Sequence, residues 1–223
     1  MKFKLIILMG CILSVSLISA VSYGERRDRT YDVTVTNMTQ GQTFTPILVV
    51  THKRGVHLFT PGSPASRELA MLAEGGATGP LAERMLMNPQ VGEVMTSGGL
   101  LGPGETATVK IAAGRGFDYV SLAAMLVPTN DGFIALNGVH APLGHTAEMY
   151  LSPAYDAGSE MNDEQCEHIP GGAMCAGEGF NEEDGEGYVH IHAGIHGIGD
   201  IDAALYDWRN PVARIVIQKG YEY

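Results

Sequence analysis

Short runs of alternating or continuously apolar residues, separated by glycine-containing turns, follow one another along the chain after its first thirty residues. Residues 31–36 alternate apolar and polar side chains, and this period of two predicts a strand with one buried face. Residues 45–51 are more continuously apolar, which predicts a central strand. Further strands are predicted over residues 106–112, 119–127, 133–139, 188–193 and 212–218.

Two segments carry helical signals instead. The first begins at Ser63-Pro64, with Ser63 as the expected N-cap, and ends at Gly75-Gly76. The second covers residues 80–87 and ends at Asn88-Pro89. About seven strands with only two short helices in the connections predict an all-β fold, an antiparallel β-sandwich, rather than an α/β sheet.

The N-terminal residues have the character of an export signal. Residues 1–20 combine a basic start, a long apolar stretch and a small-residue cleavage site ending at Ala20, which predicts a secretory signal peptide. The four residues ending at Cys11 resemble a lipobox, but the apolar run continues past Cys11, so release is favoured over lipid anchoring. Residues 21–29 are then a polar linker, and residues 30–223 form the domain. No later stretch is long and apolar enough to span a bilayer, so no membrane insertion is expected after cleavage.

Two cysteines remain after such a cleavage, Cys166 and Cys175. They lie close together in a glycine-rich loop of an exported chain, which favours a disulfide. The alternative is a pair of soft-metal ligands, which an oxidising compartment disfavours. The sequence therefore predicts a secreted or periplasmic protein with one short disulfide-closed loop.

The charge of the chain limits its partners. Its 14 Lys and Arg stand against 25 Asp and Glu, a formal net charge of −11. This charge argues against nucleic acid and anionic membrane surfaces, and it favours cations or basic partners. No G-x-S-x-G motif occurs, and no glycine-rich segment precedes the Lys-Ser/Thr pair of a phosphate-binding loop. The sequence therefore shows neither of these nucleophile and phosphate-binding motifs.

The loops around residues 127–163 gather carboxylates at predicted strand ends, among them Asp131, Asp156, Glu160 and Asp163. Carboxylate oxygens on glycine-containing loops suit a hard cation such as calcium. They also suit a solvated acidic rim. From these residues alone both interpretations stay open.

Histidines form a second group. On a strand, His190 and His192 share one face, and His196 follows after a glycine. Such a trio can bind copper or zinc. Alternatively, the three imidazoles only form hydrogen bonds that fix the end of the strand and its loop.

Five segments taken together resemble the spondin N-terminal domain family, which includes bacterial exported proteins. They are FTPILVVTH, GSPASRELAMLAEGG, VPTNDGFIALNG, MYLSPAYDAGSE and NPVARIVIQ, in the family's order. The resemblance covers roughly residues 30 to 220 and implies a C2-like β-sandwich with a calcium ion at one end.

The resemblance also implies site residues and a role. The calcium ligands fall on Asp131, Asp156 and Glu160, with Glu160 where the family often has aspartate and Gly132 where it often has an aromatic residue. The family's animal members work in adhesion, through other proteins and matrix. The resemblance therefore implies a non-enzymatic protein whose partner is a protein or extracellular-matrix ligand. The resemblance therefore favours a calcium site over a solvated acidic rim. The alternative function is copper or zinc binding by His190, His192 and His196.

Overall fold

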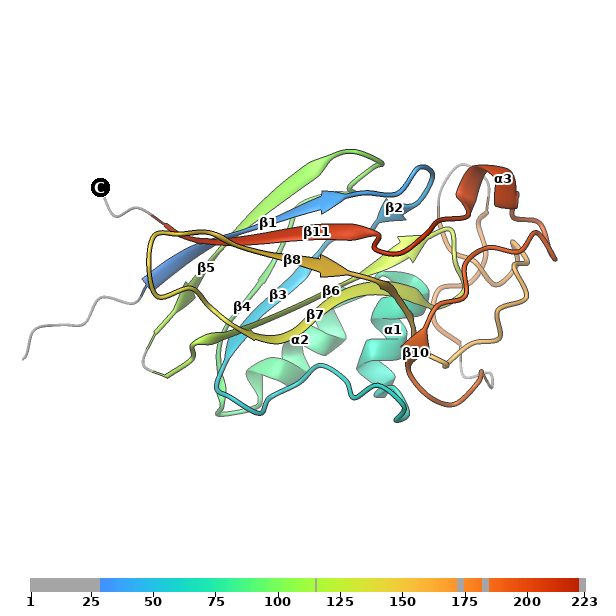
Figure 1. The fold of residues 1–223 in the computed structure, drawn as a ribbon. Helices are drawn as coiled ribbons and strands as arrows, with labels where there is room; N and C mark the ends of the chain where they lie inside the picture. Colours follow the sequence, from blue (N-terminus) through green and yellow to red (C-terminus); the bar gives the residue numbers. More distant parts are fainter. Residues whose placement is uncertain (1–28, 115, 172–174, 182–184, 221–223) are drawn as a thin grey trace, which may run out of the picture.

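The computed structural model describes residues 29–114, 116–171, 175–181 and 185–220. The signal peptide over residues 1–20, Cys11 and nearly all of the linker lie outside the described residues. Within them, two antiparallel sheets pack face to face (Figure 1). This confirms the predicted all-β sandwich. No helix in the described part of the chain has the length and apolarity needed to cross a membrane.

The smaller sheet has the strand order β5-β1-β11-β8, and the larger has β10-β9-β7-β6-β3-β4 with β2 paired to β6. The strands are β1 (Arg29–Asn37), β2 (Thr43–Phe44), β3 (Leu48–His52), β4 (Val91–Thr96), β5 (Thr106–Ala113), β6 (Tyr119–Val127), β7 (Gly132–His140), β8 (Glu148–Ser152), β9 (Ala154–Asp156), β10 (His190–Ile191) and β11 (Ala213–Lys219). The helices are α1 (Arg67–Gly75), α2 (Thr78–Leu86) and the short α3 (Ala203–Tyr206), which was not predicted.

Two apolar cores explain the sequence pattern. The first lies between the two sheets, and the second lies between the larger sheet and helices α1 and α2. Strand β3 serves both, because Val49 packs into the first core while Leu48 and Val50 pack into the second. A strand covered on both faces has to be apolar throughout, whereas β1, with only one buried face, alternates.

Two strands escaped prediction because they lie at sheet edges, and the three-residue β9, between β7 and β10, was not predicted either. β4 and β8 are edge strands with mostly exposed or half-buried residues, so neither shows a clean alternation. The expected strand over residues 188–193 shortens to β10. The two predicted strands that became β6 and β7 pair as an antiparallel hairpin, and residues 128–131 connect them.

Helix α1 begins three residues later than expected. Its N-cap is Ser66, whose hydroxyl accepts a hydrogen bond from the Leu69 N–H, and Gly76 ends it with φ of 66°. The predicted cap, Ser63, instead lies in the preceding turn. We expect Ser66→Ala to cost about 1 kcal/mol in the free energy of unfolding, because the capped N–H loses its partner. Ser63→Ala is the matched control and should be nearly neutral in urea denaturation; equal losses in both variants would contradict the cap at Ser66.

Candidate metal centre

One end of the sandwich collects the loops that carry most of the candidate residues. Figure 1 shows the segment between β9 and β11 folded at this end, beside α1. Asp131 directly precedes β7 and Asp156 ends β9, and these two strands pair so that Gly132 lies opposite Asp156. The antiparallel pairing therefore brings two predicted ligands, 25 positions apart in the sequence, close together at one end of the larger sheet.

The Asp131 carboxylate is buried and only half satisfied. Its Oδ2 accepts hydrogen bonds from the backbone N–H groups of Ser159 (2.8 Å) and Glu160 (3.2 Å). Its Oδ1 is buried without a hydrogen-bond donor. Burial and the nearby charge of Asp156 raise the pKa of Asp131 well above its ordinary value. Such a carboxylate is costly to ionise unless a cation faces it.

Asp156 is also buried, but both of its oxygens have partners. Oδ1 accepts from the Gly158 N–H at 2.8 Å, and Oδ2 accepts from the Asn162 side-chain amide at 2.7 Å. Burial raises the pKa of Asp156, while these hydrogen bonds and the nearby His190 act in the opposite direction. Its carboxylate is thus held rigidly at the strand end.

Glu160 faces a residue that the sequence did not indicate, Glu74 near the end of α1. Asn181 lies between them, because its backbone N–H donates to Glu74 Oε2 (3.0 Å) and its side-chain amide donates to Glu160 Oε1 (2.9 Å). Glu74 Oε1 and Glu160 Oε2 are buried without donors. Burial, and then the charge of Glu74, raise the pKa of Glu160 to about 8. A negative charge in the last turn of a helix interacts unfavourably with the helix dipole. The position of Glu74 near the end of the predicted helix was therefore the one sequence feature that could have pointed to it.

The three predicted calcium ligands do not lie equally close together. Oxygens that bind one calcium ion at 2.3–2.6 Å are at most about 5 Å apart. In the described residues, the group whose ligand atoms all lie within 4.8 Å of one another is Asp156, Glu186 and His190. Asp131 and Asp156 are neighbours in the sheet, whereas Glu160 is turned toward Glu74. The set Asp131, Asp156 and Glu160 stays a prediction.

The histidines occupy three different environments. His192 is buried, its Nδ1 accepts a hydrogen bond from the Gly194 N–H (3.0 Å), and its ring lies 5.0 Å from that of Trp208. Burial lowers the pKa of His192 to about 4, with the nearby His190 and His196 acting in the same direction. His190 is partly exposed and His196 is exposed. The three rings do not form a group with metal-ligand spacing in the described part of the chain.

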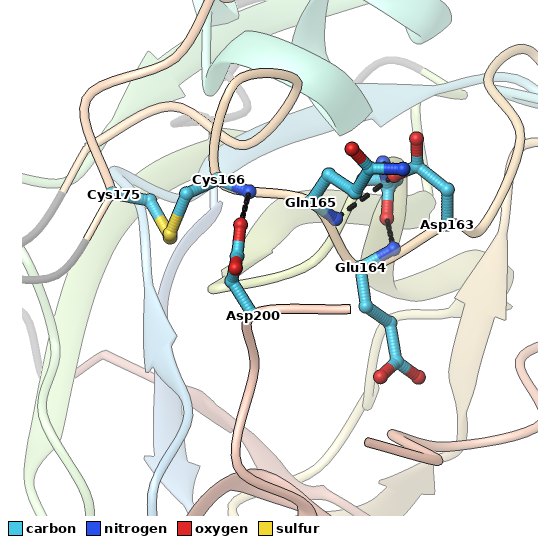
Figure 2. The surroundings of a disulfide bond; sticks show 7 residues. Asp163, Glu164, Gln165, Cys166, Cys175 and Asp200 are labelled. Atoms are coloured by element: carbon cyan, nitrogen blue, oxygen red, sulfur yellow. Dashed lines mark hydrogen bonds between the residues drawn. A yellow bond between two sulfur atoms is a disulfide. The ribbon is translucent and has the colours of Figure 1, made fainter. Parts of the chain in front are cut away.

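The neighbouring acidic residues accept hydrogen bonds that hold the loop together. Cys166 and Cys175 form the predicted disulfide, and Asp200 accepts a hydrogen bond from the Cys166 N–H at 3.0 Å (Figure 2). Glu164 points its carboxylate away from Asp163 (Figure 2) and accepts from two backbone N–H groups of the loop after β10. Asp163 is occupied by the Gln165 N–H and the His168 ring. These carboxylates therefore have structural partners of their own.

Comparison with known proteins agrees with this architecture. A search among curated proteins finds no match. The family model described as Spondin_N matches residues 30–160, which is more than half of the chain and includes β1 to β9, Asp131, Asp156 and Glu160. The chain therefore belongs to the spondin N-terminal domain family.

Proposed function

We propose that this protein is an exported, calcium-binding β-sandwich module that mediates adhesion or protein interaction at the cell surface or in the periplasm, without enzymatic activity. Membership of the spondin family suggests an extracellular, adhesion-type module. The net charge of −11 favours a basic protein or matrix partner over nucleic acid. Calcium binding is supported by the geometry of the buried carboxylates, as follows from their hydrogen bonds.

The observation that carries the proposal is the set of buried carboxylate oxygens without donors. Asp131 Oδ1, Glu160 Oε2 and Glu74 Oε1 are all of this kind. Among the described residues, Asp131 and Glu160 form no ion pair with a lysine or arginine. Buried anions are costly without a counter-charge, so this end of the sandwich is chemically suited to a hard cation.

The donor set fits calcium better than magnesium. Calcium accepts six to eight oxygens in irregular geometry, including backbone carbonyls and water, whereas magnesium demands a near-ideal octahedron. Asp131 and Asp156 are the fixed ligands of the proposed site. Two backbone N–H groups hold Asp131 through Oδ2, and hydrogen bonds to both oxygens hold the Asp156 carboxylate. Glu160 joins them by rotating its longer side chain away from Glu74.

Calcium removal tests the proposal. If calcium is present at 100 times its Kd, binding stabilises the fold by about 2.7 kcal/mol. We therefore expect EDTA to lower the melting temperature by about 5–10 °C, and added calcium to restore it. Differential scanning calorimetry measures both steps.

Substitutions assign the effect to the site. Asp131→Asn should keep the fold but remove most of the calcium-dependent shift, because it removes the charge of a fixed ligand. Asp32→Asn is the control, since Asp32 is a surface residue of β1 that forms a 3.9 Å ion pair with Lys110. An unchanged melting temperature on chelation, or an equal calcium response in Asp131→Asn, would exclude calcium binding at this site.

A further inference from the structure

The short β9–β10 ladder places His190 directly opposite Asp156, and Glu186 lies on the chain just before β10. The Nε2 atom of His190 is 3.4 Å from Asp156 Oδ1 and 4.0 Å from Glu186 Oε2. One ligand atom from each of these residues lies within 4.8 Å of the other two. One imidazole nitrogen and two carboxylate oxygens thus converge on a common point.

The His190 ring is oriented for coordination. Its Nδ1 lies 3.1 Å from the backbone carbonyl of Ile191, and a carbonyl oxygen only accepts, so Nδ1 carries the proton. In the neutral ring, Nε2 then presents a lone pair. This Nε2 atom is shielded from solvent and forms no hydrogen bond among the described residues. Metal-binding histidines commonly show this arrangement, with the other ring nitrogen fixed by a carbonyl or carboxylate.

Asn162 holds the two carboxylates beside each other. Its side-chain amide donates to Asp156 Oδ2 at 2.7 Å and to Glu186 Oε1 at 3.3 Å. Each carboxylate therefore gives one oxygen to Asn162 and turns the other, Oδ1 or Oε2, toward His190. Asp156 Oδ1 additionally accepts from the Gly158 N–H, which leaves it one lone pair. A lone pair of Nε2 facing two anionic oxygens is repulsive, and either a proton on Nε2 or a bound cation removes this repulsion.

From this geometry we propose that Asp156, Glu186 and His190 bind a zinc ion, with water in a fourth position. Ligand atoms bound to zinc at 2.0–2.2 Å in a tetrahedron are about 3.4 Å apart, which the His190–Asp156 separation matches. Glu186 closes the longer separation by a small movement, since its side chain is 36% exposed. The imidazole nitrogen favours zinc over calcium, which takes oxygen ligands.

This site differs from both expectations drawn from the sequence. It uses only His190 of the three histidines, because His192 already accepts the Gly194 N–H through Nδ1 and does not belong to the group. It shares Asp156 with the proposed calcium site but not Asp131 or Glu160. The two sites can therefore be separated by substitution.

The test is isothermal titration of the whole exported chain with Zn²⁺ in calcium-containing buffer, after removal of any affinity tag. We expect one zinc ion per chain, with affinity reduced more than about 100-fold in His190→Ala and Glu186→Gln, and about 10–100-fold in Asn162→Ala. Asp131→Asn should keep its zinc affinity while losing calcium. His196→Ala, an exposed neighbour, is the matched control and should bind zinc normally.

A second readout guards against misfolded variants. Co²⁺ should bind in place of zinc and give visible d–d absorption bands that disappear in Glu186→Gln. Because the Glu186 side chain is partly exposed, this variant should keep the fold, which circular dichroism checks. Absence of zinc binding overturns the proposal. So does zinc affinity that is unchanged in His190→Ala, or that falls equally in His196→Ala, which would place the ion on the histidines instead. Calcium binding is measured separately, so failure of either site is distinguishable.

Discussion

The metal-free protein is expected to lose stability as the pH rises from about 5 to about 8, and calcium is expected to reverse most of this loss. The physical reason is the Glu160 carboxyl, whose pKa rises from 4.5 to about 8 in the fold because of burial and the charge of Glu74. The folded state therefore holds a proton that the unfolded state has already released. Its contribution to stability is fully present below pH 4.5 and is lost as the pH rises through about 8.

The magnitude is large for a single group. A pKa raised this far corresponds to a few kcal/mol, and the raised pKa values of Glu74, Asp131 and Asp156 act in the same direction. Calcium binds the ionised carboxylates, so its stabilising effect should grow over the same pH range. Melting curves in EDTA and in calcium, recorded at several pH values between 5 and 8, measure both trends.

Glu160→Gln separates this cause from general charge repulsion. In EDTA at pH 8 the variant should be more stable than the natural chain, because the amide needs no proton, yet it should gain less from calcium. Glu178→Gln is the control, because Glu178 is an exposed carboxylate of the same acidic segment. If Glu160→Gln retained the full pH dependence, the raised pKa of Glu160 would not be its source.

Strands that are buried on one face or on both faces were predictable from the sequence, because burial imposes a regular pattern of apolar residues. β6 begins and ends where its apolar run does, and β1 shows the alternation of a strand with one buried face. β8 was not predictable because an edge strand is mostly exposed and imposes little pattern on its residues. Ser63 was mistaken for the helix cap because two serines precede the same apolar face, and only the fold decides which hydroxyl meets a free N–H.

The site was less predictable, for a topological reason. Asp131 stands next to the predicted strand over residues 133–139, but β9, which ends at Asp156, was not predicted. Their proximity follows only from the pairing of β7 with β9. Glu74 lies on α1, and Glu186 lies in a segment whose described residues form one regular strand pairing, that of the two-residue β10. Their positions depend on how helix and loop dock onto the sheet edge, which short-range sequence patterns do not encode.

The loop that carries these ligands depends on Gly158, and Gly158→Ala is expected to cost about 2–5 kcal/mol in the free energy of unfolding. Two effects add. Its φ of 64° is in the left-handed region, where a side chain costs about 1–2 kcal/mol. A Cβ would also lie 2.3 Å from the carbonyl oxygen of Tyr188, so backbone must move, at about 1–3 kcal/mol more. Urea denaturation of the variant measures the total.

Gly55→Ala measures the first effect alone, so its difference from Gly158→Ala gives the second. Gly55 also has positive φ, 88°, but a Cβ there meets no atom within 4 Å, so only the conformational cost applies. The excess loss in Gly158→Ala then reports the close approach of the two chain segments. The Gly158 N–H donates to Asp156, and the Gly158 carbonyl accepts from Gly187, next to Glu186. Moving this backbone should therefore weaken calcium and zinc binding together, whereas equal losses in both glycine variants, with metal affinities intact, would show that the segments do not need this contact.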